Sequence, residues 1–204
     1  GQLRGVVVVE RDISRADLDA MDRLGVVGIR LNLMGKALPD FSQPEWKLLF
    51  DHIAELDWHV ELHRHVADIP ALIRGLIPFG VKIVVDHFGR PDARLGLEQP
   101  GFREMLELGL GGQVWMKVSG IYRLEGSKQE NLDFARAALP LLVQSFGPQR
   151  LVWGSDWPHT QHEKQVSYGT VVEQLQALGC SPQVMRSLLI EAPQVLFDFS
   201  VVEA

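Results

Sequence analysis

Short apolar runs alternate along the chain with longer segments in which apolar residues recur every three or four positions. The short runs are typical of strands and the longer segments of amphipathic helices. Because most of the runs are apolar at nearly every position, they predict strands that are buried on both faces, as in a parallel sheet. The predicted strands are Val6–Val9, Val26–Asn32, Trp58–His63, Lys82–His87, Val114–Ser119 and Leu151–Asp156.

A helix is predicted after each of these strands. Ser14 is expected to cap the first helix, with Asp17 three residues on, and Gly25 to end it. Ser42 and Glu45 have the spacing of a capping box for the second helix. The later helices are predicted at Ile69–Ile77, Phe102–Leu110, Leu132–Phe146 with a bend at Pro140, Val171–Leu178 and Val184–Leu196.

Six strand-then-helix units in unbroken order predict a parallel sheet with right-handed crossovers. A doubly wound sheet would usually carry a Gly-rich phosphate loop after its first strand, but Glu10, Arg11 and Asp12 stand there. The pattern therefore favours a (β/α)8 TIM barrel, which needs eight strands in about 250 residues. We expect residues 1–204 to form a single barrel domain that is N-terminally incomplete, with two βα units of the barrel ahead of Gly1.

Composition narrows the class of partner. The chain has 204 residues, of which 46% are apolar, and its net charge is −6, which disfavours nucleic acid and anionic membranes as partners. The single Cys180 cannot form an intrachain disulfide, and no apolar run is long enough to span a membrane. We therefore expect a soluble protein of the cytoplasm.

Ionisable and polar side chains gather at the carboxyl ends of the predicted strands. In a parallel barrel these ends open on one face, where the βα loops build the active site. Each such residue has a structural alternative, because a lone His is more often a hydrogen-bonded structural group than a catalyst; we give His52, His59 and His162 that interpretation. The strand-end residues are Arg30, Asn32, His63, Arg64, His65, Asp86, His87, Arg90, Lys117, Ser119, Tyr122, Arg123, Ser155, Asp156 and His159.

Two of these ends carry recognisable motifs. They read His-Phe-Gly-Arg-Pro at residues 87–91 and Val-Trp-Gly-Ser-Asp-Trp-Pro-His at residues 152–159. With them the sequence resembles the amidohydrolase superfamily, in its branch of small-acid decarboxylases and lactonases, and especially the 2-pyrone-4,6-dicarboxylate lactonases and related lactonases. The resemblance covers essentially the whole chain, whose strands resemble strands three to eight of that barrel.

The resemblance implies a hydrolase that opens the lactone ring of a small carboxylated substrate without a cofactor. Asp156 would be the general base that takes a proton from the attacking water, and His87 would orient or polarise the scissile carbonyl. The implied substrate-binding residues are Arg30, Lys36, His63, Arg90, Tyr122 and Arg123. Arginine suits this role because its fork makes bidentate contacts to carboxylates.

Two alternatives stay open. The first is a metal-dependent amidohydrolase or decarboxylase in which His63, His87 and Asp156 bind Zn²⁺ or another divalent ion together with a His-x-His pair on an N-terminal strand. His63 favours it, because the metal-dependent members of the family place a histidine ligand at this position. The second alternative is an inactive barrel that binds a small acid. A homo-oligomer is possible in each case, because six strands leave two sheet edges exposed.

Overall fold

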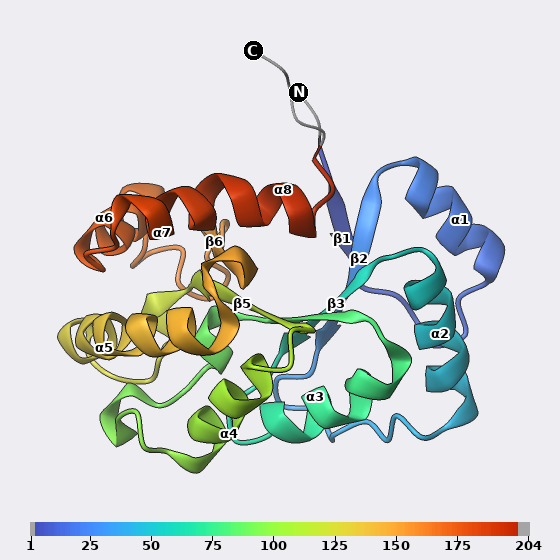
Figure 1. Cartoon of the computed structure of the whole chain (residues 1–204), viewed down its shortest axis with the longest axis horizontal. Coiled ribbons are helices and arrows are strands. Elements are labelled where there is room, and N and C mark those ends of the chain that lie inside the picture. The colour runs from blue at the N-terminus through green and yellow to red at the C-terminus, as the bar shows by residue number, and fades with distance from the viewer. Residues whose placement is uncertain (1–2, 200–204) are drawn as a thin grey trace.

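The computed structural model describes residues 3–199, and its centre is a curled parallel sheet of six strands (Figure 1). Each strand pairs with the next along the chain, so the spatial order is the sequence order and β1 and β6 form the two edges. The six predicted parallel strands are thereby confirmed. Their bounds are β1 (Gly5–Val7), β2 (Val26–Asn32), β3 (His59–His63), β4 (Lys82–Val85), β5 (Val114–Ser119) and β6 (Leu151–Gly154).

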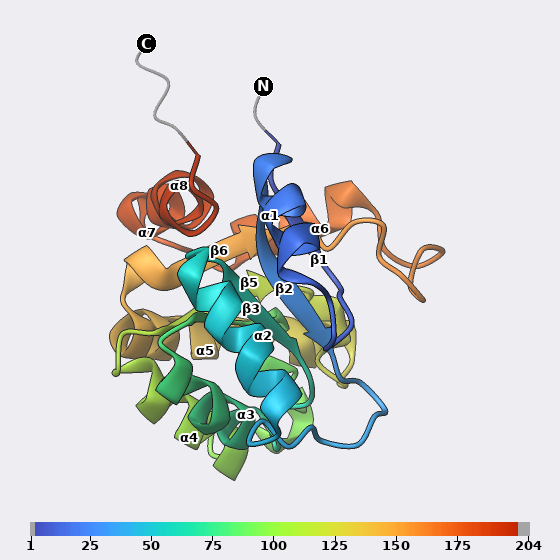
Figure 2. The same ribbon diagram turned by 90° about the vertical axis from the view of Figure 1, so that its right-hand side faces the viewer.

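Helices α1 to α5 follow one another around the outside of the sheet, as Figures 1 and 2 show. They are α1 (Arg15–Arg23), α2 (Pro44–Glu55), α3 (Ile69–Leu76), α4 (Pro100–Gly109) and α5 (Lys128–Phe146). Three further helices follow β6, namely α6 (Tyr168–Ala177), α7 (Pro182–Arg186) and α8 (Ala192–Leu196). A π-helical stretch, Ser187–Glu191, joins α7 to α8 without a break, so the helix predicted over 184–196 is confirmed, with a wider turn in its middle.

The main hydrophobic core lies between the sheet and the outer helices. Alternate strand residues such as Ile29, Val60, Ile83 and Met116 point into it and are fully buried. The core stabilises the fold because each such aliphatic side chain contributes roughly 1.5–3 kcal/mol when it is removed from water. The other residues of each strand point to the opposite side, which we call the inner face.

The inner face is apolar at one end and polar at the other. Val84, Trp115 and Val152 pack there against Ala192 and Leu196 of α8, which Figure 1 shows beside β6. Towards the carboxyl ends of the strands, the same face carries charged side chains. The C-terminal helix thus covers the apolar end and leaves the chemistry at the strand ends.

The helix starts agree with the sequence in one case and differ in another. Ser14 caps α1 as expected, because its hydroxyl oxygen accepts from the backbone N–H of Asp17 at 3.1 Å. The capping box predicted for Ser42 and Glu45 is wrong: α2 begins at Pro44, and the Ser42 hydroxyl donates to the Asp40 carboxylate at 2.6 Å instead. Proline at the first helical position removes one of the N–H groups that would otherwise lack a partner, and its fixed φ angle suits the start of a helix.

Three predicted strands, β1, β4 and β6, end earlier than expected, and the residues that follow the last two bear the chemistry. β4 stops at Val85 and β6 at Gly154, so His87 and Asp156 lie in loops just beyond the sheet. Both have positive φ angles, 51° and 57°, which ends the extended conformation. Among residues 3–199, no helix is both long and apolar enough to cross a membrane.

Candidate active site

Four charged side chains form a ladder on the inner face, in which the carboxylates are buried and the cations partly buried; three come from β2, β3 and β5, and Asp86 directly follows β4. Arg30 of β2 donates from Nε and Nη2 to Asp86 Oδ2, at 2.9 and 2.6 Å. Lys117 of β5 lies 2.6 Å from Glu61 Oε1 and 3.0 Å from Asp86 Oδ1. Burial works against each charge, but the opposite charges outweigh it: the pKa values of Glu61 and Asp86 lie below their usual range and that of Lys117 lies above it.

His87 lies above this ladder, in the loop that follows β4. Its Nδ1 is 2.9 Å from the Ser119 hydroxyl, and its Nε2 is 3.6 Å from Asp156 Oδ1. Burial lowers the pKa of His87 to about 4, although Asp86 and Asp156 raise it. The imidazole is therefore neutral at pH 7. Gly120 makes room for the ring, since a Cβ at that position would lie 2.6 Å from His87 Nδ1.

Asp156 has one carboxylate oxygen held and the other turned towards His87. Oδ2 accepts hydrogen bonds from the Tyr122 hydroxyl at 2.6 Å and from Arg123 Nε at 2.5 Å. Burial would raise the pKa of Asp156, but His87, Tyr122 and Arg123 outweigh it and hold the pKa below its usual range. Asp156 is thus ionised at neutral pH. Burial and the neighbouring Asp156 carboxylate raise the pKa of Tyr122, so its hydroxyl stays protonated and donates.

Arg30, His87 and Asp156 open into a cavity of about 380 Å³ at the strand ends, which we call the strand-end cavity. It is lined by Arg30, Asn32, Met34, His63, His87, Arg90, Arg123, Asp156, Thr160 and Gln161. Six of the eight predicted site residues line it, from five different strands or the loops that follow them. The convergence at one edge that the sequence pattern predicted is therefore present in the fold.

The arginines of the strand-end cavity are each paired with a carboxylate. Arg30 faces Asp86, Arg123 faces Asp156, and Arg90 donates from Nη2 to Glu125 at 2.9 Å. The Nε of Arg90 is buried and has no hydrogen-bond partner among the described residues. Each guanidinium has five N–H donors, so these contacts leave donors free for a ligand.

His63 lines the cavity beside His87. Its Nδ1 lies 2.9 Å from Asn32 Oδ1, and the His63 and His87 rings meet edge to face with centroids 5.5 Å apart. Burial and the nearby charge of Arg30 lower the pKa of His63 to about 3, so it is neutral at pH 7. A neutral histidine can accept or donate a hydrogen bond, but it adds no charge for an anionic substrate.

Two predicted substrate-binding residues lie elsewhere. Tyr122 lies behind Asp156 rather than in the cavity wall. Lys36 lines a neighbouring groove of about 550 Å³, which borders the strand-end cavity along Arg30 and Asn32. The loop that carries Lys36 is fixed by Arg64, which donates to the Lys36 carbonyl at 2.7 Å.

We did not predict Glu61 as a site residue from the sequence, and we expected His59 to be a structural residue. Glu61 interrupts the apolar run of β3, and a carboxylate in the middle of a buried strand was the signal that could have identified it. His59 is fully buried, and its Nε2 lies 3.3 Å from Glu61 Oε1, so it supports the ladder from below. Gly28 leaves space for this ring, because a Cβ there would come within 2.6 Å of it.

The metal-binding arrangement can be tested on the donor atoms. Asp156 Oδ2 already accepts two hydrogen bonds, and His87 Nδ1 is engaged with Ser119. In the part of the chain from residue 3 to residue 199, no group of three or more His, Cys, Asp or Glu side chains is placed to hold a metal ion. The hydrogen bonds leave Asp156 Oδ1 and His87 Nε2 free, so the alternative in which two further ligands come from an N-terminal strand stays a prediction.

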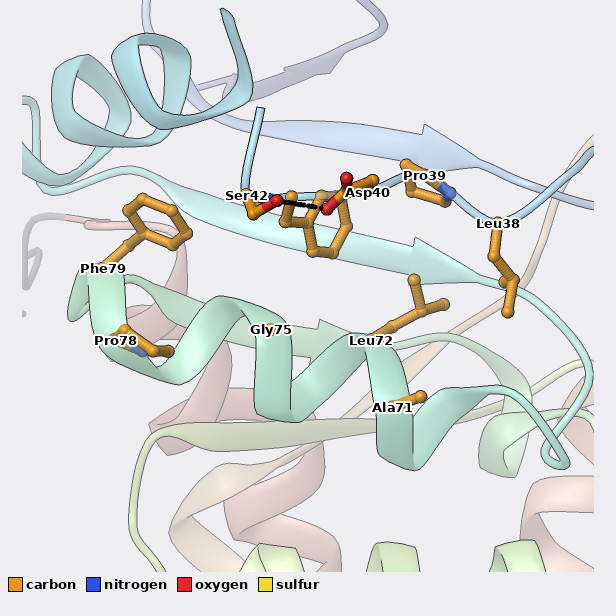
Figure 3. Close-up of a pocket in the computed structure, with 10 residues that line it drawn as sticks. Leu38, Pro39, Asp40, Ser42, Ala71, Leu72, Gly75, Pro78 and Phe79 are labelled. Atoms are coloured by element: carbon orange, nitrogen blue, oxygen red, sulfur yellow. Dashed lines mark hydrogen bonds between the residues drawn. The ribbon is translucent and has the colours of Figure 1, made fainter. Parts of the chain in front are cut away.

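A second hollow, of about 440 Å³, lies between the loop after β2 and helix α3 (Figure 3). Its wall is mostly apolar, and its polar groups Asp40 and Ser42 are hydrogen-bonded to each other. Gly75 lets the helix approach the loop, because a Cβ there would lie 2.9 Å from the Phe41 ring. Since none of the strand-end groups reaches this hollow, the candidate active site is the strand-end cavity.

Comparison with known proteins places the chain in a family. The chain is 33% identical to a 2-pyrone-4,6-dicarboxylate hydrolase of Comamonas testosteroni, over 97% of this chain and 67% of that protein. It is 27% identical to a 4-sulfomuconolactone hydrolase of Hydrogenophaga intermedia, over 97% of this chain and 66% of the relative. The chain therefore spans about two thirds of the length of these curated relatives.

A solved structure gives the same result for the fold. The crystal structure of a Pseudomonas putida protein, provisionally named 2-pyrone-4,6-dicarboxylic acid hydrolase, superposes with a TM-score of 0.95 at 60% identity, over 98% of this chain and 73% of that one. A family model described as amidohydrolase matches residues 1–199. The chain belongs to the amidohydrolase family.

Proposed function

We propose that this chain carries the active site of a hydrolase that opens the lactone ring of a small carboxylated substrate such as 2-pyrone-4,6-dicarboxylate. The observation that carries the proposal is the position of Asp156, whose carboxylate lies beside neutral His87 in a cavity lined by three arginines. The names of the relatives support it, since they describe hydrolases of a pyrone dicarboxylate and of a muconolactone. The curled sheet further supports a (β/α)8 barrel as the architecture.

The substrate class follows from the charges around the cavity. Arg30, Arg90 and Arg123 bring three guanidinium groups to one pocket of about 380 Å³, a size that suits a small molecule. Guanidinium forks bind carboxylates by two parallel hydrogen bonds. A small ring with two carboxylates matches these donors better than an uncharged lactone does.

Asp156 is the base in the proposed reaction. It is ionised at pH 7, and because Tyr122 and Arg123 occupy Oδ2, the free oxygen is Oδ1. Oδ1 takes a proton from water as the water oxygen bonds to the lactone carbonyl carbon. When the tetrahedral intermediate collapses, the ring C–O bond breaks and the leaving oxygen takes the proton back from Asp156. The products are a carboxylic acid and an enol, which together contain all the atoms of the lactone and the water.

His87 polarises the carbonyl in this scheme. In this scheme the Ser119 hydroxyl donates to Nδ1, so the single proton of the neutral ring is on Nε2, which faces the same region as Asp156 Oδ1. An N–H at this place donates to the carbonyl oxygen and stabilises the negative charge that develops on it. Ser119 thus selects the tautomer that the reaction needs.

The experiment that tests this proposal replaces Asp156 with Asn in the full-length protein. Loss of the base should lower kcat for hydrolysis of 2-pyrone-4,6-dicarboxylate by at least about 100-fold, measured as the decay of the pyrone absorbance. Asp133→Asn is the matched control, because Asp133 is an exposed residue of α5 and should leave kcat unchanged. Retention of most of kcat by Asp156→Asn would refute the assignment.

Independence from metal is the second part of the proposal. The same assay, run after dialysis against a strong chelator and again after addition of Zn²⁺, should give the same kcat each time, because water is activated by Asp156 rather than by a metal ion. A loss of activity that Zn²⁺ restores would favour the metal-dependent alternative with His63, His87 and Asp156 as ligands.

A further inference from the structure

In the loop after β6, the buried His159 lies against Tyr122, the residue whose hydroxyl donates to the Asp156 carboxylate. The backbone N–H of His159 donates to the Asp156 carbonyl at 2.8 Å, which closes a turn between the two residues. The ring of His159 is then 4% exposed, and its Nδ1 lies 3.4 Å from the Tyr122 hydroxyl oxygen. The proposed mechanism gives this histidine no role.

The direction of the hydrogen bonds follows from a count of protons. Tyr122 has one hydroxyl proton, and Asp156, being ionised, can only accept it. The Tyr122 oxygen must therefore accept from His159, so the proton of the His159 ring is on Nδ1. Its Nε2 is buried and has no hydrogen-bond partner among the described residues. The Nδ1 contact is thus the one polar interaction of this ring within the part of the chain that the structure describes.

We propose that His159 is a positioning residue that acts through Tyr122 on Asp156. His159 Nδ1–H fixes the phenol, and the phenol together with Arg123 fixes Oδ2, so that Oδ1 is kept beside His87. This inference rests on the proposed role of Asp156 as the base. It also gives Tyr122 a different task from substrate binding, since its hydroxyl is spent on the carboxylate.

Orientation matters because a carboxylate can rotate about its bond to Cβ. One donor on Oδ2 fixes a point, whereas two donors from different directions fix the plane of the group. Tyr122 can serve as the second donor only while its own ring is held, and its polar anchor is His159; the His162 ring packs on its side, with centroids 5.0 Å apart. A misplacement of the base by about 1 Å can cost about 100-fold in rate.

A pair of substitutions separates this role from simple packing. In His159→Asn the amide N–H takes the place of Nδ1, whereas in His159→Gln it takes the place of Nε2 and the donor to Tyr122 is lost. Both variants lose the imidazole ring. We expect His159→Gln to lower kcat about 10-fold, the equivalent of one lost hydrogen bond, with KM unchanged, and His159→Asn to retain most of kcat. Equal losses of kcat in the two variants, or a change in KM alone, would overturn the proposal.

Tyr122→Phe provides a second route to the answer that does not depend on how variants at residue 159 fold. It should lower kcat with KM unchanged, and adding His159→Gln to it should cost nothing further, because the chain is already broken. A rise in KM alone would assign Tyr122 to substrate binding and overturn the proposal. Full additivity of the two losses would do the same.

The two proposals fail in different ways. If Asp156→Asn keeps its activity, the base is misassigned and the proposed function fails. If Asp156→Asn is inactive while Asn and Gln at residue 159 behave alike, the base stands and only the role of His159 is wrong. Binding of isophthalate, an unreactive ring with two carboxylates in a 1,3 relation, should be unchanged in His159→Gln, since the arginines are untouched.

Discussion

At the scale of single residues, each of the two proposed catalytic side chains has one polar atom held by a neighbour and one polar atom free to meet the substrate. Asp156 has Oδ2 occupied and Oδ1 open, and His87 has Nδ1 occupied by Ser119 and Nε2 open. The sequence could place both residues at strand ends and could predict their types of chemistry. It could not predict which atom of each is free, because that depends on Tyr122, which is separated from Asp156 by 34 residues.

Arg90 offers a prediction at this scale. Arg90→Met keeps an unbranched apolar stem and removes the guanidinium from the cavity wall. Loss of a charge-assisted hydrogen bond costs about 1.5–3 kcal/mol, so KM for the dicarboxylate should rise by roughly 10- to 100-fold with a smaller effect on kcat. Steady-state kinetics with 2-pyrone-4,6-dicarboxylate would measure this split.

Arg94→Met is the control for this measurement. Arg94 follows on the same loop but pairs with Asp92 at 2.7 Å and does not line the cavity, so its kinetics should match those of the wild type. An unchanged KM in Arg90→Met would remove Arg90 from the substrate-binding set. Arg123 is a less selective target, because it also holds Asp156.

At the scale of elements, the sequence pattern predicted where the helices lie, but it did not always predict the residue at which a helix begins. Ser127 and Glu130 form a true capping box for α5, but the sequence reasoning started this helix at Leu132, its first apolar residue. The same four-residue spacing failed at Ser42, because Asp40 competes for the hydroxyl two residues away. At Ser42 the neighbouring Asp40 thus prevents a capping box, and the pattern of apolar residues carries no information about such a competitor.

At the scale of the whole molecule, the order of the strands could be predicted and the contacts across the inner face could not. Unbroken alternation of strand and helix leaves few topologies, and parallel pairing in sequence order is among them. In contrast, the periodicity of residues 184–196 shows that one side is apolar but not that Ala192 and Leu196 lie against Trp115. The ladder joins β2, β3, β5 and the end of β4 in the same way, through partners that are far apart in sequence.

The buried His87 gives a prediction for how the stability of the whole fold depends on pH. Its pKa is about 4 in the folded protein, against about 6.5 in an unfolded chain. Between these values the unfolded state binds the proton more readily, so the free energy of unfolding should fall as the pH drops from about 6.5 to about 4, by up to about 1.4 kcal/mol per pH unit from His87. His63, whose pKa is lowered to about 3, acts in the same direction.

Urea unfolding at pH 7, 6 and 5 would measure this slope. His87→Gln removes the titrating ring, so its unfolding free energy should depend less on pH over the same interval. Equal slopes for the wild type and His87→Gln would contradict the assignment of this pH dependence to His87.

The pairing of every arginine in the strand-end cavity affects how a substrate finds it. Arg30, Arg90 and Arg123 each face a carboxylate of the protein. At a distance the opposite charges of each pair therefore largely cancel, and these arginines give the pocket little net positive charge. Fields of this kind fade within a short distance, and salt screens what remains beyond about 8 Å. Long-range electrostatic steering therefore contributes little to capture, and the anion is selected only after it has entered, when its carboxylates compete at close range with Glu125 for Arg90 and occupy the remaining donors.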